Sequence, residues 1–334
     1  MLPGLQLSDL CAGVATTELL PNLRKAAIEF GAFTLDCSPL GGLQTLALGA
    51  AERFFRLTDA EKRTVHLSQF THFRGYSRVD TSADAREQLH LGPDPEWDST
   101  EHDPGPRKEP FWGLLGPNLW PSGLAARDRT ILEDYFAQVS DCGVKLLELI
   151  AHAFELPKQC LSKLVSPEPY NLMKLMRYAA NGASFSDAKG MAAHCDWSLL
   201  TLLAQSADGL WIQTPYGQWL EVPHVPGTLV VNFGEILEIV TGGQLLATPH
   251  RVCVRNDTAR LSLPVFINPD LRQLISPVVE VVAADSRLVS QPKTDSGHTH
   301  RVHQPGAPYT MFRYGDSEWQ RKGLGRWCYS DACC

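Results

Sequence analysis

The sequence predicts a mixed α/β fold with a mainly β core, because its two halves differ in hydrophobic periodicity. Residues 1–170 place apolar side chains at helical spacing, whereas residues 171–270 contain short β-prone runs separated by Gly, Pro, Asn and Asp. Seven such runs follow one another, which favours a double sheet or barrel over alternating βαβ units. The runs are NLMKLMRYA, SLLTLLAQ, LWIQTP, WLEVP, GTLVVNFG, HRVCVR and LSLPVFINP.

The helical N-terminal half is expected to pack on this core as part of one structural unit. Leu19, Leu23, Ala27 and Phe30 predict a helix that ends at Gly31, before a strand candidate at 32–35. The other expectations for this half are a short strand before the first helix, a helix over 42–57, a capped turn at 59–62, a long aperiodic loop over 68–126 and an amphipathic helix over 127–156.

Composition excludes several classes of protein. The 334 residues contain 37 Asp and Glu against 30 Lys and Arg, so the acidic balance argues against a nucleic-acid surface. No apolar run reaches membrane-spanning length, and the first residues lack the pattern of a signal peptide. The nine cysteines are irregularly spaced without a CxxC pair, which indicates reduced thiols. We therefore expect a cytoplasmic protein, a monomer or homodimer, with no membrane and no nucleic-acid partner.

A candidate metal site begins at the sequence Ala193-His194-Cys195-Asp196-Trp197. In an extended strand, residues i and i+2 point to the same face, so His194 and Asp196 can bind one ion while Cys195 faces away. A second histidine in a β context, His250, follows after several strands that can fold back. Two imidazoles and one carboxylate form the ligand triad of non-haem Fe(II) oxygenases, which leaves positions open for oxygen and a co-substrate.

A second pair of residues, Arg260 and Ser262, repeats the i, i+2 spacing ten residues beyond His250. A guanidinium and a hydroxyl on one strand face can bind a carboxylate, with bidentate geometry available to the arginine.

These motifs together resemble the isopenicillin N synthase-like family of Fe(II)- and 2-oxoglutarate-dependent dioxygenases. The resemblance runs in order through HCDWSLLTLLAQ, DGLWI, WLEV, GTLVVNFGEILEIVTGG, ATPHRV and RLSLPVF, with weaker matches at FGAFTL, FFRLTDAEKR, RGYS and REQLHLG. It implies a double-stranded β-helix (jelly roll). It also implies that His194, Asp196 and His250 bind iron, that Arg260 and Ser262 bind the distal carboxylate of 2-oxoglutarate, and that O2 is consumed, with ascorbate as a stimulant.

One departure concerns the tyrosine that touches the co-substrate in many members of the family. Where they carry Asn-Tyr-Tyr-Pro, this chain has Leu175-Met176-Arg177-Tyr178-Ala179, so either orientation of Tyr178 stays open.

The implied function is oxidation of a C–H bond in a small organic substrate, by hydroxylation, desaturation or cyclisation, in natural-product or specialised metabolism. Two alternatives stay open. One is an iron oxidase in which the Arg260 clamp holds the substrate and 2-oxoglutarate is not used. The other is a non-catalytic member of the fold that binds a small carboxylate.

The walls of the substrate pocket are harder to predict from the sequence. The candidates are Arg74, Trp197, Asn232, Phe266, Tyr309 and Phe312. Asn232 has two alternative roles, in stabilising the turn beside the metal or in contacting the reaction centre. Arg74, Arg78 and Arg86 flank the expected mouth, with a solvated position as the default for each.

Two further features lie in the C-terminal extension, 271–334. A helix is predicted from Pro308 to Lys322, either as a lid whose aromatic face (Tyr309, Phe312 and Trp319) lines the pocket or as an ordinary surface helix. The HTHRVH run at 298–303 and the Cys333-Cys334 pair are expected to be a solvated loop and inert thiols.

Overall fold

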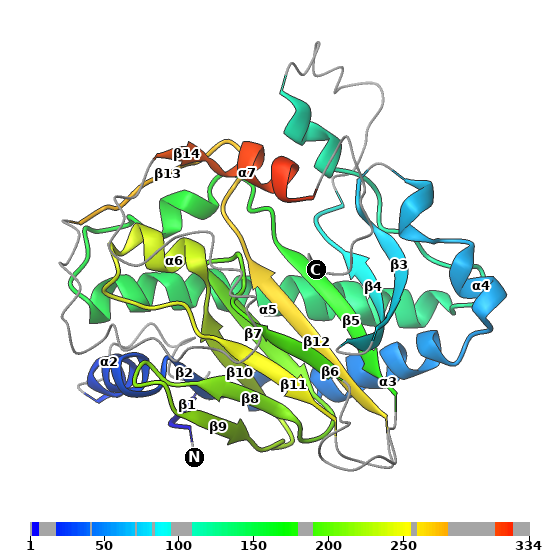
Figure 1. Ribbon diagram of the computed structural model, residues 1–334, viewed down its shortest axis with the longest axis horizontal. Helices are drawn as coiled ribbons and strands as arrows, with labels where there is room; N and C mark the ends of the chain where they lie inside the picture. Colours follow the sequence, from blue (N-terminus) through cyan, green and yellow to red (C-terminus); the bar gives the residue numbers. More distant parts are fainter. Residues whose placement is uncertain are drawn as a thin grey trace.

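Two facing β-sheets form the centre of the computed structural model, with helices covering the far side of the larger sheet (Figure 1). The structure describes residues 2–6, 18–40, 42–70, 72–81, 84–94, 109–179, 190–254, 259–279 and 311–322. In spatial order, the large sheet contains β1 (Gly4–Gln6), β2 (Ala32–Asp36), β10 (Thr228–Phe233), β7 (Leu200–Gln205), β12 (Arg260–Ile267), β5 (Leu172–Tyr178), β4 (Ala85–Leu91) and β3 (Gly75–Asp80). The small sheet contains β6 (Gly190–His194), β11 (His250–Cys253), β8 (Leu210–Gln213) and β9 (Trp219–Val222).

The predicted double-stranded β-helix is confirmed. Strands β10, β7, β12 and β5 of the large sheet face the four strands of the small sheet, and the eight alternate between the sheets along much of the chain. The seven β-prone runs correspond to β5 and β7–β12, and β6 completes the set. Apolar side chains fill the space between the sheets, including Met176, Leu203, Ile212 and Val252.

The described residues form six helices, and the first, second and fourth of them bury apolar side chains against the other face of the large sheet. They are α2 (Leu19–Phe30), α3 (Leu43–Phe55), α4 (Asp59–Arg63), α5 (Ala126–Ala153), α6 (Glu235–Val240) and α7 (Tyr314–Arg321), with short 3-10 segments η1 (Ser38–Leu40), η2 (Leu67–Gln69), η3 (Pro110–Leu114) and η4 (Ser162–Val165). The long helix α5 runs across the sheet (Figure 1) and buries Leu132, Tyr135, Val139, Leu146 and Ile150, which recur at helical spacing.

Local signals at the helix ends agree with the sequence. The predicted capped turn at 59–62 is the short helix α4, where Thr58 and Glu61 form a reciprocal capping box. Helix α2 ends at Gly31, whose φ of 70° is a conformation that favours glycine. Among the described residues, no helix combines the length and apolar character needed to cross a membrane.

The prediction of an aperiodic loop over 68–126 is wrong, because this stretch contains β3, β4 and η3. Strands β3 and β4 pair with each other, and β4 pairs with β5, so the hairpin widens the large sheet. Its sequence hides the alternation because neither face is simply apolar: Arg86 and Gln88 are buried on one face, and on the other Glu87 binds Lys62 and Arg177.

The prediction of one helix over 308–322 is also wrong. Phe312 and Arg313 form β14, which pairs with β13 (Leu274–Ile275), and the helix α7 begins only at Tyr314. Pairing with β13 holds Phe312 extended, so it does not share a helical face with Trp319. Tyr309, the HTHRVH run and Cys333-Cys334 lie outside the described residues.

Candidate active site

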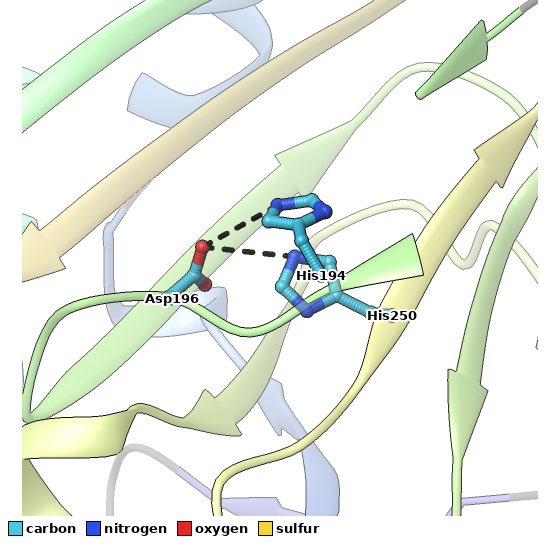
Figure 2. A group of neighbouring side chains, drawn as sticks. All are labelled: His194, Asp196 and His250. Atoms are coloured by element: carbon cyan, nitrogen blue, oxygen red, sulfur yellow. Dashed lines mark ion pairs between the residues drawn. The ribbon is translucent and has the colours of Figure 1, made fainter. Parts of the chain in front are cut away.

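Three side chains bring potential metal-binding atoms together at one end of the β-helix. His194 ends β6, Asp196 lies in the turn that follows, and His250 begins β11. Oδ1 of Asp196 lies 3.7 Å from Nε2 of His194 and 3.7 Å from Nε2 of His250. Figure 2 shows this carboxylate oxygen directed at both imidazole rings. The cluster is the only group of three or more potential ligands found among the described residues.

The small sheet positions both histidines. His194 and His250 are directly opposite each other in the β6–β11 pair, and their ring centroids are 4.3 Å apart. Nδ1 of His194 is 2.9 Å from the carbonyl oxygen of Ala192, and Nδ1 of His250 is 3.0 Å from that of Thr248. Since a carbonyl only accepts, each Nδ1 carries the proton and donates it, which leaves the lone pair on Nε2 facing Asp196.

The large sheet positions the carboxylate. Thr201 on β7 and Asn232 on β10 donate hydrogen bonds to Oδ2 of Asp196, at 2.6 Å and 3.0 Å. With Oδ2 occupied, Oδ1 is the oxygen left to face the histidines. Asn232 thus holds the acidic residue beside the histidines.

Burial and neighbouring charge set the protonation states at the site. Burial, with His250 beside it, lowers the pKa of His194 to about 4, so this imidazole is neutral at neutral pH. Burial alone would raise the pKa of Asp196, but the two histidines and the hydrogen bonds from Thr201 and Asn232 outweigh it and lower that pKa. A neutral imidazole beside an ionised carboxylate is the state in which these groups bind a metal ion.

Arg260 lies deeper between the sheets, with only 1% of its surface exposed. Its Nη2 donates to Oε1 of Gln205 at 2.8 Å, and its Nε donates to the carbonyl of Ala207 at 3.3 Å. Its Nη1 is buried and has no hydrogen-bond partner among the described residues. Among the described residues, no carboxylate lies within 4.0 Å of this guanidinium, and a buried cation with an unused donor fits an anionic ligand.

Tyr178 faces the same interior as this arginine. It is directly opposite Arg260 in the β5–β12 pair, and the guanidinium carbon lies 5.4 Å from the centre of its ring. Ser262 is buried two residues further along β12 and shares that face. Burial raises the pKa of Tyr178, so its phenol stays protonated. The Tyr178 side chain, whose orientation the sequence left open, therefore points inward.

The remaining pocket candidates lie around the triad in different ways. Trp197 follows Asp196 and stacks on Phe312 of β14, with ring centroids 5.8 Å apart. Phe266 is opposite Thr201 in the β7–β12 pair and therefore shares its inward face. Arg78 is half-exposed, as expected for a solvated side chain. The same expectation is wrong for Arg74 and Arg86, which are 1% and 4% exposed.

Sequence reasoning missed two residues that support the site, Thr201 and Gln205. Both lie on β7, four residues apart on one face, so that one holds Asp196 and the other holds Arg260. Both occur within SLLTLLAQ, and alternation from Thr201 would have placed them on the inward face.

The residues present fit an Fe(II) ion and an acidic co-substrate. Two imidazole nitrogens and one carboxylate oxygen, each oriented by a hydrogen bond on its far side, match the ligand set of non-haem iron. The unpaired Nη1 of Arg260 fits the distal carboxylate of 2-oxoglutarate.

The chain is similar to known Fe(II)- and 2-oxoglutarate-dependent oxygenases in sequence and in structure. The sequence profile of the 2OG-Fe(II) oxygenase superfamily matches residues 170–269, and that of the N-terminal region of non-haem dioxygenases in morphine synthesis matches residues 2–123. A 2-oxoglutarate-dependent dioxygenase of Gibberella zeae is 33% identical over 277 residues, covering 75% of this chain and 71% of that protein. A second dioxygenase of this type, frbJ of a Dothideomycetidae species, is 32% identical, covering 74% and 68%. The crystal structure of a full-length Neurospora crassa protein in complex with 2-oxoglutarate superposes with a TM-score of 0.76 at 20% identity, covering 97% and 96%.

Proposed function

The chain belongs to the 2OG-Fe(II) oxygenase superfamily, and on that premise we propose that it oxidises a C–H bond of a small organic substrate in natural-product or specialised metabolism. The outcome is hydroxylation, desaturation or cyclisation, with conversion of 2-oxoglutarate to succinate and CO2. The observation that carries the proposal is the triad, in which every ligand is oriented by a hydrogen bond and the three facing atoms are close together.

We assign iron binding to His194, Asp196 and His250. When bound, Fe(II) with 2-oxoglutarate and O2 supplies the oxidation of the C–H bond. The protein orients the three ligands, keeps both imidazoles in the Nδ1-protonated form and holds the carboxylate ionised.

We assign the co-substrate to the interior face of β12 and β5. Arg260 would bind the distal carboxylate through Nη1, and the hydroxyl of Ser262 shares the same face. Gln205 fixes the guanidinium, and the Tyr178 ring packs against it. This arrangement favours use of 2-oxoglutarate over the oxidase alternative, since the clamp lies deep in the barrel rather than at its mouth.

The function is tested by measuring succinate formation by the purified protein with Fe(II), 2-oxoglutarate and O2, with and without candidate substrates. We expect slow succinate release alone and faster, substrate-coupled release with the right compound. Oxidation of a substrate without succinate would identify an oxidase, and absence of 2-oxoglutarate binding would identify a non-catalytic protein.

Replacing Thr201 by valine is expected to weaken Fe(II) binding by about 10- to 100-fold, because it removes a donor that orients a metal ligand without changing the shape of the side chain. Anaerobic Fe(II) titration measures this effect. Thr201→Ser, which keeps the hydroxyl, should bind almost as the wild type does. Equal Fe(II) affinity in the valine variant would show that Asn232 alone suffices to orient Asp196.

We propose that the segment 311–322 covers the metal end of the barrel. Phe312 stacks on Trp197, the residue next to Asp196. The guanidinium carbon of Arg321 lies 4.6 Å from the centre of the same Trp197 ring. Helix α7 also packs on η3, where Trp319 fills the space beside Gly113. Because Tyr314 is fully buried, deleting the whole segment would expose the core, so a point substitution is the cleaner test.

Phe312→Ala is expected to admit water beside the metal site and so raise succinate release that is not coupled to substrate oxidation. Fe(II) and 2-oxoglutarate affinities should not change. The matched control is Met311→Ala, since the Met311 side chain is 65% exposed. If succinate release and substrate oxidation stay in the wild-type ratio in Phe312→Ala, the segment is not a cover.

A further inference from the structure

A row of inward-facing positions crosses the large sheet at the level of the metal cluster. Asn232 and Thr201, which hold Asp196, are opposite each other in the β10–β7 pair. Thr201 is opposite Phe266, and Phe266 is opposite Leu172. Since Leu91 is opposite Met173, the next position of the row is Gly92, at the end of β4. The row therefore leads from the metal ligands to Gly92.

The head group of Arg74 lies at this end of the row. A methyl group on residue 92 would overlap Nη1 of Arg74, so the guanidinium occupies the space that glycine leaves. Arg74 is 1% exposed. Its Nη1 is 3.4 Å from Oδ1 of Asn118 and its Nη2 is 3.3 Å from the carbonyl oxygen of Pro93, which are long contacts. Its Nε has no hydrogen-bond partner in the part of the chain that the structure describes.

Arg74 forms no ion pair within the described part of the chain, and the more distant Asp94 only partly offsets the burial that lowers the pKa of Arg74. Among the described residues, no carboxylate lies within 4.0 Å of its guanidinium, whereas two neighbouring cations have partners: Arg86 pairs with Asp84 at 2.8 Å, and Lys322 with Glu318 at 3.4 Å. A buried arginine without a carboxylate is unfavourable unless a ligand supplies the negative charge.

The groups around Arg74 strengthen the need for a negatively charged ligand. Its guanidinium carbon and Nζ of Lys322 lie 5.9 Å and 5.5 Å from the centre of the same Tyr170 ring, so two cations contact one aromatic ring. His90 points to the same interior and is directly opposite Lys174, and its buried Nε2 has no hydrogen-bond partner among the residues described. Burial and the surrounding cations lower the pKa of His90 well below its ordinary value, so it stays neutral and supplies no negative charge beside Arg74.

We infer, on the basis of the proposed function, that the substrate is an organic acid whose carboxylate binds Arg74. The planar fork of the guanidinium matches a carboxylate bidentately, and one unpaired cation matches a monoanion better than a phosphate dianion. Three strand spacings separate Thr201 from Gly92, roughly 14 Å along the sheet. The carbon that is oxidised therefore lies several bonds from the carboxylate, with Phe266 beneath the intervening part of the molecule.

The test compares acids with their neutral amides on the wild-type protein. The probes are ω-phenylalkanoates from phenylacetate to 6-phenylhexanoate and the matching amides, titrated anaerobically into protein that holds Fe(II) and saturating 2-oxoglutarate, so that Arg260 is already occupied. At least one acid should bind about 10- to 100-fold more tightly than its amide, the range expected for a hydrogen bond between charged groups. Absence of any acid preference across the series would overturn the inference, and a stronger preference for 4-phenylbutyl phosphate would reassign the site to phosphate esters.

Two variants then locate the preference. Arg74→Gln should remove it while leaving amide, Fe(II) and 2-oxoglutarate affinities unchanged, and Arg74→Lys should retain part of it. The control is Arg78→Gln, since Arg78 is half-exposed on the adjoining strand β3. An acid preference that survives in folded Arg74→Gln would contradict the assignment. If 2-oxoglutarate fails to bind the wild-type protein, the proposed function fails instead, and that measurement is made first.

Discussion

Replacing His250 by alanine is expected to abolish 2-oxoglutarate turnover and to remove most Fe(II) binding. The substitution deletes one of three ligands from a buried site and leaves Asp196 facing a single imidazole. Turnover is measured as succinate release, and metal binding by anaerobic Fe(II) titration. Asp196→Ala should have the same effect, because one oxygen of that carboxylate faces both histidines.

The control for this experiment is His152→Ala, since His152 is exposed near the end of α5. It should retain wild-type turnover and metal content. Full turnover in His250→Ala would contradict the assignment of the metal ligands. A melting temperature of His250→Ala close to that of the metal-free wild type would show that its loss of turnover is not due to unfolding.

Arg260→Ala is expected to leave Fe(II) bound but to weaken 2-oxoglutarate binding by about 2–5 kcal/mol, because it removes a buried partner of a charged group. In dissociation constants this is about 30-fold to several thousand-fold. Titration of 2-oxoglutarate into the anaerobic Fe(II) protein measures it. The 2-oxoglutarate affinity of Arg260→Lys should lie between those of the wild type and Arg260→Ala, since a lysine keeps the charge and loses the planar fork.

A matched arginine lies on the opposite face of the neighbouring strand. Arg177 is adjacent to Tyr178 on β5 but points to the helices, where it pairs with Glu87. Arg177→Ala should therefore leave 2-oxoglutarate affinity unchanged. Unchanged 2-oxoglutarate affinity in Arg260→Ala, together with lost substrate affinity, would favour the oxidase alternative.

The parts of the fold that the sequence predicted are those in which one face of an element is apolar. Helix α5 and strands β5 and β7–β12 bury apolar side chains with clear periodicity or as continuous runs. The hairpin β3–β4 was missed because its buried positions include Arg86 and Gln88, whose polar groups find partners only in the folded protein. A polar interior of this kind gives no hydrophobic signal.

The candidate site divides in the same way. His194, Asp196, His250, Arg260 and Ser262 were identified by spacing and by resemblance, and the structure places the first three together. The role of Asn232 as a donor to Asp196 depends on the register between β10 and β7, and the burial of Arg74 depends on the close approach of Gly92. Neither is local in the sequence, so neither could be derived from it.

The division of the triad between the two sheets has a mechanical consequence. Both histidines belong to the small sheet, whereas the carboxylate is fastened to the large sheet through Thr201 and Asn232. An ion bound by all three side chains therefore joins the two sheets at their open end. Separation of β6 and β11 from the large sheet would break the bonds to the metal. The tighter the ion binds, the smaller is the population of the protein in which this end has opened. A bound ion would thus also hold the two sheets together at this end of the barrel.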